Sequence, residues 1–235
     1  MSNNVWTTTI MFDENYRVFG LSFPNTFDYV EFHELNRVGA TAEEKERIAK
    51  LLDARIEVTK KYHLAEKILP ENAPITLYAN GFSKTVKLPS FFRTQEGFVI
   101  LTEECANVLK KFRLGENTLY PLSFFDIQLN ELVNDQTYYF FNIAELRSYL
   151  RPEDSIRKLR KATYTKHEGY QLFNLYEAFY ADHAIAVAKE AVECDVDLWQ
   201  DLELDNSIFM SDELKKALDE AQLSDAWQLF LCDLK

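Results

Sequence analysis

The chain has 235 residues, of which 47% are hydrophobic, so it can bury one large core or two small ones. A formal net charge of −12 argues against binding nucleic-acid phosphates as the main activity, because such binding depends on lysine and arginine. Six glycines are too few for an activity built on glycine-rich phosphate-binding turns. Composition therefore favours a globular protein with a basic protein partner and excludes a disordered chain.

Cysteine usage and the first residues predict a cytoplasmic protein. Cys105, Cys194 and Cys232 are odd in number and widely spaced, which indicates reduced thiols. The opening "MSNNVWTTT" has neither the basic nor the apolar region of a secretion signal. No run approaches the ~20 apolar residues of a membrane span, so we expect no membrane partner.

The N-terminal region predicts strands followed by one long charged helix. Residues 16–23 and, less regularly, 27–35 are typical of strands. Residues 41–64 predict a helix that begins at a capping box formed by Thr41 and Glu44. Its expected apolar stripe is Ile48, Leu51, Leu52 and Ile56, and its expected ion pairs are Glu43–Arg47, Glu46–Lys50 and Glu57–Lys61.

Four further elements are expected before the C-terminal region. Residues 73–88 predict a hairpin that turns at Asn80-Gly81. Residues 137–143, "TYYFFNI", predict a buried strand, and residues 170–180 favour a strand slightly over a helix. Residues 182–193 predict a helix capped by Asp182, followed by an acidic connection over residues 195–207.

One phrase occurs twice without a gap. "GFVILTEECANVLKKFRL" (97–114) aligns with "NSIFMSDELKKALDEAQL" (206–223), and each is followed by a second apolar run. Both copies predict a strand, a helix capped by Thr102 or Ser211, and a second strand. The acids that follow each cap, Glu103-Glu104 and Asp212-Glu213, suit the helix dipole better than acid–base catalysis.

These elements predict an α+β fold. We expect an aromatic-rich mixed sheet, two related strand–helix–strand units and one long charged helix near the N-terminus. The predicted division is an N-terminal part, residues 1–89, and a region of residues 90–235 that contains the repeats 97–122 and 206–232. The two parts could also form one continuous domain.

Candidate catalytic and metal sites are weak. His33, His63, His167 and His183 are dispersed, with no helical pair and no cysteine pair beside them. "DVDLWQD" (195–201) lacks the glycine and the glutamate of a calcium loop, which leaves an exposed acidic loop as the preferred interpretation. We therefore predict no catalytic residue, no metal site and no cofactor.

Charge is unevenly distributed along the C-terminal half. Residues 190–225 carry an excess of ten negative charges, whereas residues 151–166 carry an excess of four positive charges. The acidic stretch is either a solvated face or a surface for a basic partner. The basic stretch, which includes "RKLRK" (157–161), is either an internal charge partner or a surface for a different molecule.

The repeat also carries a resemblance to a known family. "DLWQDLELDNSIFMSDELKKALDEAQLSDAWQLFLC" (197–232), with its D-x-W context, and "FVILTEECANVLKKFRLGENTLYPL" (98–122) resemble the polymorphic-toxin immunity proteins of family eleven. The resemblance covers residues 90–235. It departs from the family pattern at Ser224-Asp225, where a glycine is usual. It implies a cytosolic protein that binds and neutralises a cognate toxin, often a nuclease, and it implies no catalytic residues.

The leading hypothesis is therefore a bacterial immunity protein that occludes a toxin stoichiometrically. An acidic surface would steer the protein towards a basic cleft. The expected contact residues are those of the acidic connection: Asp195, Asp197, Trp199, Asp201, Glu203 and Asp205. Trp199 is either an interface anchor or a core residue. An enzyme of unrecognised type, with a pocket around His167 or His183, and an adaptor without a toxin partner are the alternatives.

Overall fold

The computed structural model describes residues 4–9, 19–36, 40–79, 88–94, 96–156, 159–175 and 181–235. They form two compact units, each assembled from separate stretches of chain. Unit 1 comprises Met1–Met11, Asn107–Asn117 and Ile143–Lys235, and unit 2 comprises Phe12–Ala106 and Thr118–Asn142. The predicted boundary after residue 89 is a boundary of neither unit. The α+β fold with mixed sheets is confirmed.

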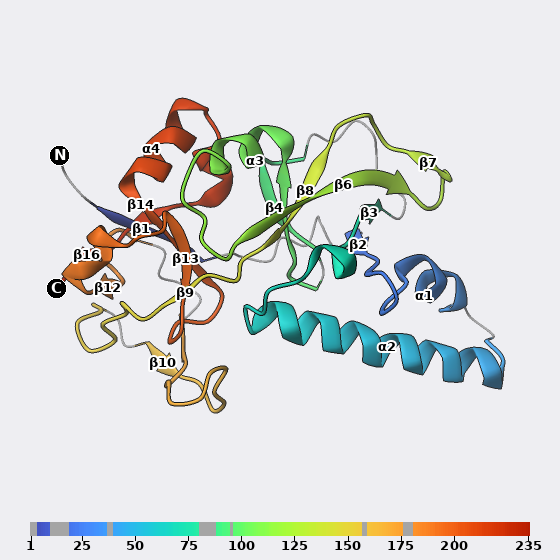
Figure 1. Ribbon diagram of the computed structural model, residues 1–235. Helices are drawn as coiled ribbons and strands as arrows, with labels where there is room; N and C mark the ends of the chain where they lie inside the picture. Colours follow the sequence, from blue (N-terminus) through green and yellow to red (C-terminus); the bar gives the residue numbers. More distant parts are fainter. Residues whose placement is uncertain are drawn as a thin grey trace. The chain divides into compact units, whose positions relative to one another are not determined.

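Unit 2 is built on a curled sheet (Figure 1). Its strand order is β2 (Phe19–Leu21), β3 (Thr76–Ala79), β6 (Thr118–Asp126), β8 (Tyr138–Asn142), β5 (Val99–Thr102) and β4 (Phe91–Arg93), and β7 (Glu131–Leu132) pairs with β6. Only β3 and β6 are parallel among these pairs of described strands. The curl brings the two outermost strands together, because Phe19 and Phe92 lie 5.6 Å apart between ring centroids.

Aromatic side chains fill the inside of this sheet. All five residues of β8 are buried, as predicted for "TYYFFNI". Tyr62 contributes from the helix α2 (Ala42–His63), and its ring lies 5.1 Å from Phe98 and 5.6 Å from Phe140. The Tyr62 hydroxyl donates to the Phe141 carbonyl (3.1 Å) and accepts from the Val99 amide (3.1 Å). These bonds tie the helix to two neighbouring strands.

The charged helix α2 begins as predicted. Thr41 accepts from the Glu44 amide, and the Glu44 carboxylate accepts from the Thr41 amide, which completes the capping box. The ion pairs Glu46–Lys50 and Glu57–Lys61 are present, at 2.8 Å each. Two details differ from the prediction. Arg47 pairs with Glu31 instead of Glu43, and Ile56 is 61% exposed, so the buried stripe is Leu51, Val58 and Tyr62.

The predicted strand over residues 27–35 is wrong, because this segment forms the helix α1 (Tyr29–Leu35). Asp28 accepts hydrogen bonds from the Val30 and Glu31 amides and so starts the helix. The Tyr29 ring covers Gly20, where an added Cβ would lie 2.0 Å from the ring. Residues 16–18, and the expected turn at Asn80-Gly81, lie outside the described residues.

Unit 1 contains a second mixed sheet. Its strand order is β15 (Phe230–Leu231), β1 (Val5–Thr9), β14 (Ser207–Ser211), β13 (Leu198–Asp201) and β9 (Leu146–Arg147). Two short pairs accompany it, β10 (Arg160–Lys161) with β11 (Phe173–Asn174) and β12 (Ala186–Val187) with β16 (Asp233–Leu234). Trp199 and Phe209 stack in the core of this unit, with 6.0 Å between their ring centroids.

The predicted helix over residues 182–193 is wrong. The segment contains β12 and a short 3₁₀ helix, η3 (Lys189–Glu193). Asp182 does not cap it, because the Asp182 carboxylate accepts from the Leu231 amide instead (2.8 Å). Residues 170–180 include the short strand β11, and residues 176–180 lie outside the described part. The other 3₁₀ helices described are η2 (Pro70–Asn72) and η4 (Ser224–Trp227).

The repeat is confirmed as two strand–helix–strand units. In the first copy, β5 leads through α3 (Glu103–Leu109) to β6. Both strands belong to unit 2 and are antiparallel to β8, which lies between them, whereas α3 begins in unit 2 and ends in unit 1. In unit 1, β14 leads through α4 (Asp212–Glu220) to β15, and both strands are antiparallel to β1. Each copy therefore joins two parallel strands across an inserted antiparallel one.

The register of the two copies corresponds closely. Leu101 and Pro121 both pair with Tyr139, whereas Met210 and Leu231 both pair with Trp6. The middle strand comes from a later part of the chain in one copy and from the N-terminal part in the other.

None of the helices in the described part of the chain combines the length and the apolar character that a membrane span requires.

Candidate partner-binding site

The acidic connection folds into β13, an inner strand of the sheet in unit 1. Asp197, Trp199 and Asp201 alternate along the chain and have exposed fractions of only 4%, 1% and 5%. They therefore cannot contact a partner directly in this conformation. The expected continuous acidic surface over residues 195–205 is wrong for these three positions, because the sheet buries them and hydrogen bonds hold both carboxylates.

Asp197 accepts hydrogen bonds from both the side chain and the backbone amide of Arg113. Its carboxylate accepts from Arg113 Nε (3.1 Å), Arg113 Nη2 (3.0 Å) and the Arg113 amide (2.9 Å). Burial opposes ionisation, but the hydrogen bonds from Arg113 and from the Ser211 hydroxyl outweigh it and lower the pKa of Asp197. The Arg113 side chain is 62% exposed, so water screens part of the Coulombic attraction.

Asp201 satisfies three backbone amides. One carboxylate oxygen accepts from Tyr149 (2.7 Å) and Leu150 (3.0 Å), and the other accepts from Glu203 (3.0 Å). Burial is the largest influence and raises the pKa of Asp201 in spite of these hydrogen bonds. Asp201 therefore orders the chain that follows β9 and the turn that follows β13.

A charge network surrounds Arg147. Its guanidinium donates to Glu145 and to Asp195 Oδ1, the latter at 2.7 Å. Burial alone would lower the pKa of Arg147, but the hydrogen bonds to Asp195 and Glu145 outweigh burial and raise this pKa. The Asp195 side chain is 80% exposed and keeps a lowered pKa because it accepts from Arg147. Asp195 is therefore accessible to a partner, but its charge is already compensated.

Asn117 and Gly115 fix the loop that carries Arg113. The Asn117 side chain accepts from the Ala144 and Glu145 amides (2.9 Å each) and donates to the Leu198 carbonyl (2.8 Å). Gly115 has a φ of +59°, and an added Cβ would lie 1.9 Å from Glu145 Oε2. Sequence reasoning missed this network, and the one signal that could have pointed to it is Gly115, a glycine in a chain with only six.

Asp205 is also paired. It binds Lys166, and it accepts a hydrogen bond from the Tyr164 hydroxyl (3.1 Å). Lys166 belongs to the basic stretch of residues 151–166, so one end of that stretch is an internal charge partner, as one of the two interpretations predicts. The exposed fractions of the Lys166 and Asp205 side chains, 15% and 9%, place this pair inside unit 1.

Glu203 differs from its neighbours, because no lysine, arginine or histidine among the described residues lies within ion-pair distance of it. It is half-buried, and the pKa of Glu203 is raised by burial and by the negative charges of Asp201 and Glu153, with Arg151 only partly offsetting them. Glu190 and Glu193 on η3 are exposed in the same unit. Among the described residues, Glu153 and Glu203 thus make no ion pair, and Arg151 offsets their repulsion only in part.

The residues considered for catalysis form no metal-binding group within the described part of the chain and line none of the three hollows described. The described residues contain no group of three or more His, Cys, Asp or Glu that could hold a metal ion. The hollows lined by described residues 22–78, 23–72 and 160–175 have no histidine in their walls. Cys105, Cys194 and Cys232 are buried free thiols. Glu103 and Glu104 are exposed at the start of α3.

Asp212 is buried and accepts from Trp6 Nε1 (2.9 Å), and it pairs with Lys216 (2.6 Å). Its hydrogen bonds hold β1 against the start of α4, which agrees with the structural interpretation of the acids after each cap.

In comparisons with known proteins, neither the protein families nor the curated proteins searched gave a match to this chain.

Proposed function

We propose that this chain is a cytoplasmic immunity protein that binds a basic bacterial toxin, such as a nuclease, and occludes its active site stoichiometrically. The observation that carries the proposal is the pair of acids Glu153, which is exposed, and Glu203, which is half-buried: they repel each other and make no ion pair among the described residues of a chain of net charge −12. A lysine or arginine of the partner would relieve this repulsion on binding, so electrostatic energy would favour the complex.

The resemblance of residues 90–235 to immunity proteins supports the same conclusion. The structure refines which residues of the acidic connection could take part. Asp195 and Glu203 are the accessible members. The side chains of Asp197, Trp199, Asp201 and Asp205 are almost fully covered and hold the accessible ones in place. The buried acids act on binding only by holding the exposed ones in place.

The proposal is tested by co-expression with the product of the gene next to its own, in cells that this product harms. The double variant Glu153→Lys/Glu203→Lys should lose most of its protection, because two repulsive charges replace two attractive ones. Glu71→Lys, at an exposed acid in unit 2, is the matched control and should protect fully. Thermal unfolding of each variant shows whether it is folded.

Two results would contradict the proposal. Full protection by the folded double variant would remove this surface from the interface. A neighbouring gene product that is harmless, or that harms cells equally with and without this chain, would remove the immunity function itself and favour an adaptor.

A further inference from the structure

A hollow in unit 1 lies on the basic stretch that the proposed toxin interface does not use. It has a volume of about 340 Å³, which is at the small end of the range for ligand pockets. Its walls are the strand β10 with the residues after it and the partner strand β11: Arg160, Lys161, Ala162, Thr163, Tyr164, Asn174 and Leu175. Cations, hydrogen-bonding groups and apolar surface therefore meet in one place.

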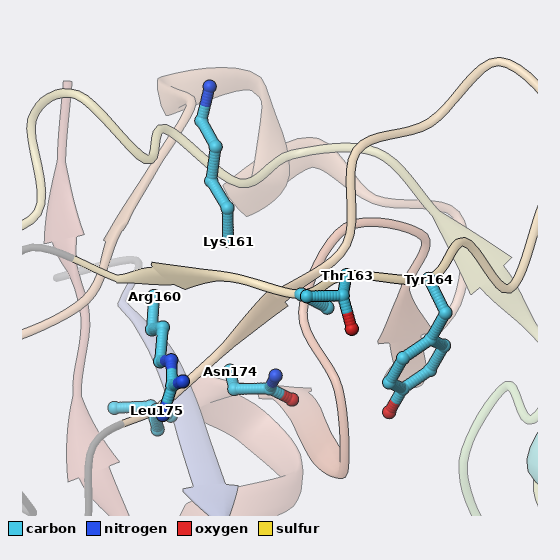
Figure 2. A pocket seen from close by; sticks show the side chains of 7 residues that line it. Arg160, Lys161, Thr163, Tyr164, Asn174 and Leu175 are labelled. Carbon is cyan, nitrogen blue, oxygen red and sulfur yellow. The ribbon is translucent and has the colours of Figure 1, made fainter.

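The two cations that line this hollow have no carboxylate partner among the described residues, and only one of them, Arg160, extends to the side of β10 where Thr163 and Asn174 lie (Figure 2). Arg160 and Lys161 are exposed and make no ion pair there, although Lys166, a few residues later, is paired with Asp205. An unpaired guanidinium presents a planar set of donors that fits the oxygens of a phosphoryl or carboxylate group. The hollow is thus electrostatically complementary to an anion.

The strand geometry places uncharged donors beside the guanidinium. Arg160 and Asn174 are directly paired across β10 and β11, so their side chains share one face of the pair. Figure 2 shows Arg160, Thr163 and Asn174 extending to the same side of β10, whereas Lys161 extends to the opposite side. A guanidinium, a hydroxyl and an amide thus line the hollow on one side of β10.

The Tyr164 ring suggests what the rest of the ligand is. Its hydroxyl donates to Asp205, which fixes the phenol end, while the residue remains 52% exposed. An exposed aromatic ring offers a face for stacking a planar base, which contributes about 1–3 kcal/mol in nucleic-acid-binding proteins. The hollow is also larger than one phosphoryl group needs.

We propose that this hollow binds a small phosphorylated ligand of mononucleotide size, with the phosphoryl group at Arg160, Thr163 and Asn174 and the ring against Tyr164. The negative net charge does not prevent this, because charges farther away than about 8–10 Å are largely screened at physiological salt. Binding should be weak and should weaken further as salt is added. The hollow lies near Glu203, because the Phe173 amide of β11 donates to the Glu203 carbonyl (2.7 Å). It uses other side chains than Glu153 and Glu203, so a failure to bind AMP would leave the proposed immunity function untouched.

Calorimetric titration of the whole chain with AMP, ribose 5-phosphate and adenosine at low salt tests the site. AMP should bind most tightly, ribose 5-phosphate less tightly, and adenosine very weakly. Arg160→Gln should weaken AMP binding by about tenfold or more, since a charged donor pair is lost. Lys189→Gln, which removes an exposed cation elsewhere in unit 1, should leave it unchanged.

Three results would overturn the proposal. These are equal binding of adenosine and AMP, unchanged AMP binding by Arg160→Gln, and no binding of AMP up to about 10 mM. Binding of a glutamate-rich peptide without binding of AMP or ribose 5-phosphate would also overturn it, in favour of an acidic protein partner.

Tyr164→Leu should weaken the binding of AMP more than the binding of ribose 5-phosphate. An equal loss of affinity for both ligands would refute the stacking role of Tyr164.

Discussion

Gly115 is the residue on which the charge network of unit 1 depends most directly. Its φ of +59° disfavours any side chain, and an alanine Cβ would lie 1.9 Å from Glu145 Oε2 and 2.9 Å from Val196. Gly115→Ala should lower the free energy of unfolding by about 2–4 kcal/mol, because backbone strain adds to displacement of a buried carboxylate. Urea denaturation measures the change.

Gly169→Ala is the matched control for this substitution. Gly169 also has a positive φ, +85°, but an added Cβ would meet nothing within 4 Å. Gly169→Ala should therefore lower the free energy of unfolding only by the backbone strain, about 1 kcal/mol. Equal losses for the two variants would show that Glu145 moves aside freely and that the network is not rigid.

Asp197 should make stability depend on acidity. Its pKa is lowered in the folded protein from a reference of 3.8, so its ionised form stabilises the fold above that pH. This contribution is lost as the pH falls through the lowered pKa. Asp197→Asn lacks it, so the difference in unfolding free energy between wild type and variant should shrink between about pH 6 and pH 3. A constant difference over this range would contradict the assignment.

The acids of β13 also show what a local pattern cannot predict. Residues 195–205 contain alternating acids, which are typical of an exposed loop as much as of a strand edge. The groups that neutralise them, Arg113, Arg147 and Lys166, come from segments far away in the sequence. Burial of Asp197 and Asp201 depends on these long-range partners and on backbone amides, so it could not be inferred from spacing.

The two copies of the repeated element differ at their caps. Ser211 Oγ accepts from the Leu214 amide (3.2 Å), as predicted, whereas Thr102 Oγ1 is buried without a hydrogen-bond partner among the described residues. Ser211→Ala should therefore destabilise the protein by about 1 kcal/mol, or somewhat more because the hydroxyl also donates to Asp197. Thr102→Val should be neutral or stabilising by up to about 1 kcal/mol. Thermal unfolding compares them, and equal destabilisation would refute the difference between the caps.

The end of α4 explains how the repeat manages without the expected glycine. Gln222 has a φ of +59°, and the Leu223 amide donates to the Leu218 carbonyl (2.9 Å), which closes the helix in a Schellman-type turn. Glutamine thus occupies the left-handed position where glycine is usual, two residues before Ser224. The departure at Ser224-Asp225 does not disturb the turn, because η4 begins there.

Elements with strong local signals were predictable, and those decided by neighbours were not. The capping box of α2, the buried strand β8 and the ungapped repeat all have signals within a few residues. Residues 27–35 contain β-forming aromatics, but the cap at Asp28 and packing on Gly20 favour a helix. Residues 182–193 have helix-forming composition, but β12 pairs with β16 from the end of the sequence.

At the scale of the whole molecule, many acids that cluster in the sequence are paired with bases in the fold, so the sequence alone does not show where negative charge is exposed. Six of the twelve acids in residues 190–225 are held by Arg113, Arg147, Lys166, Lys215, Lys216 or backbone amides. The other six make no ion pair among the described residues: Glu190, Glu193, Glu203, Glu213, Glu220 and Asp225. The surface around Glu153 and Glu203, which we propose for the partner, is therefore one part of the negative charge that is left without an ion pair. The sequence could indicate a basic partner from the net charge, but the location of the surface required the fold.

The most direct test of the account is calorimetric titration of the purified chain with the product of the neighbouring gene. We predict one-to-one binding that inhibits the toxin and weakens about tenfold or more when salt rises from about 50 to about 300 mM, because screening reduces the electrostatic attraction. Absence of binding, or binding that leaves the toxin fully active, would contradict the proposal that this chain neutralises a basic toxin by occlusion.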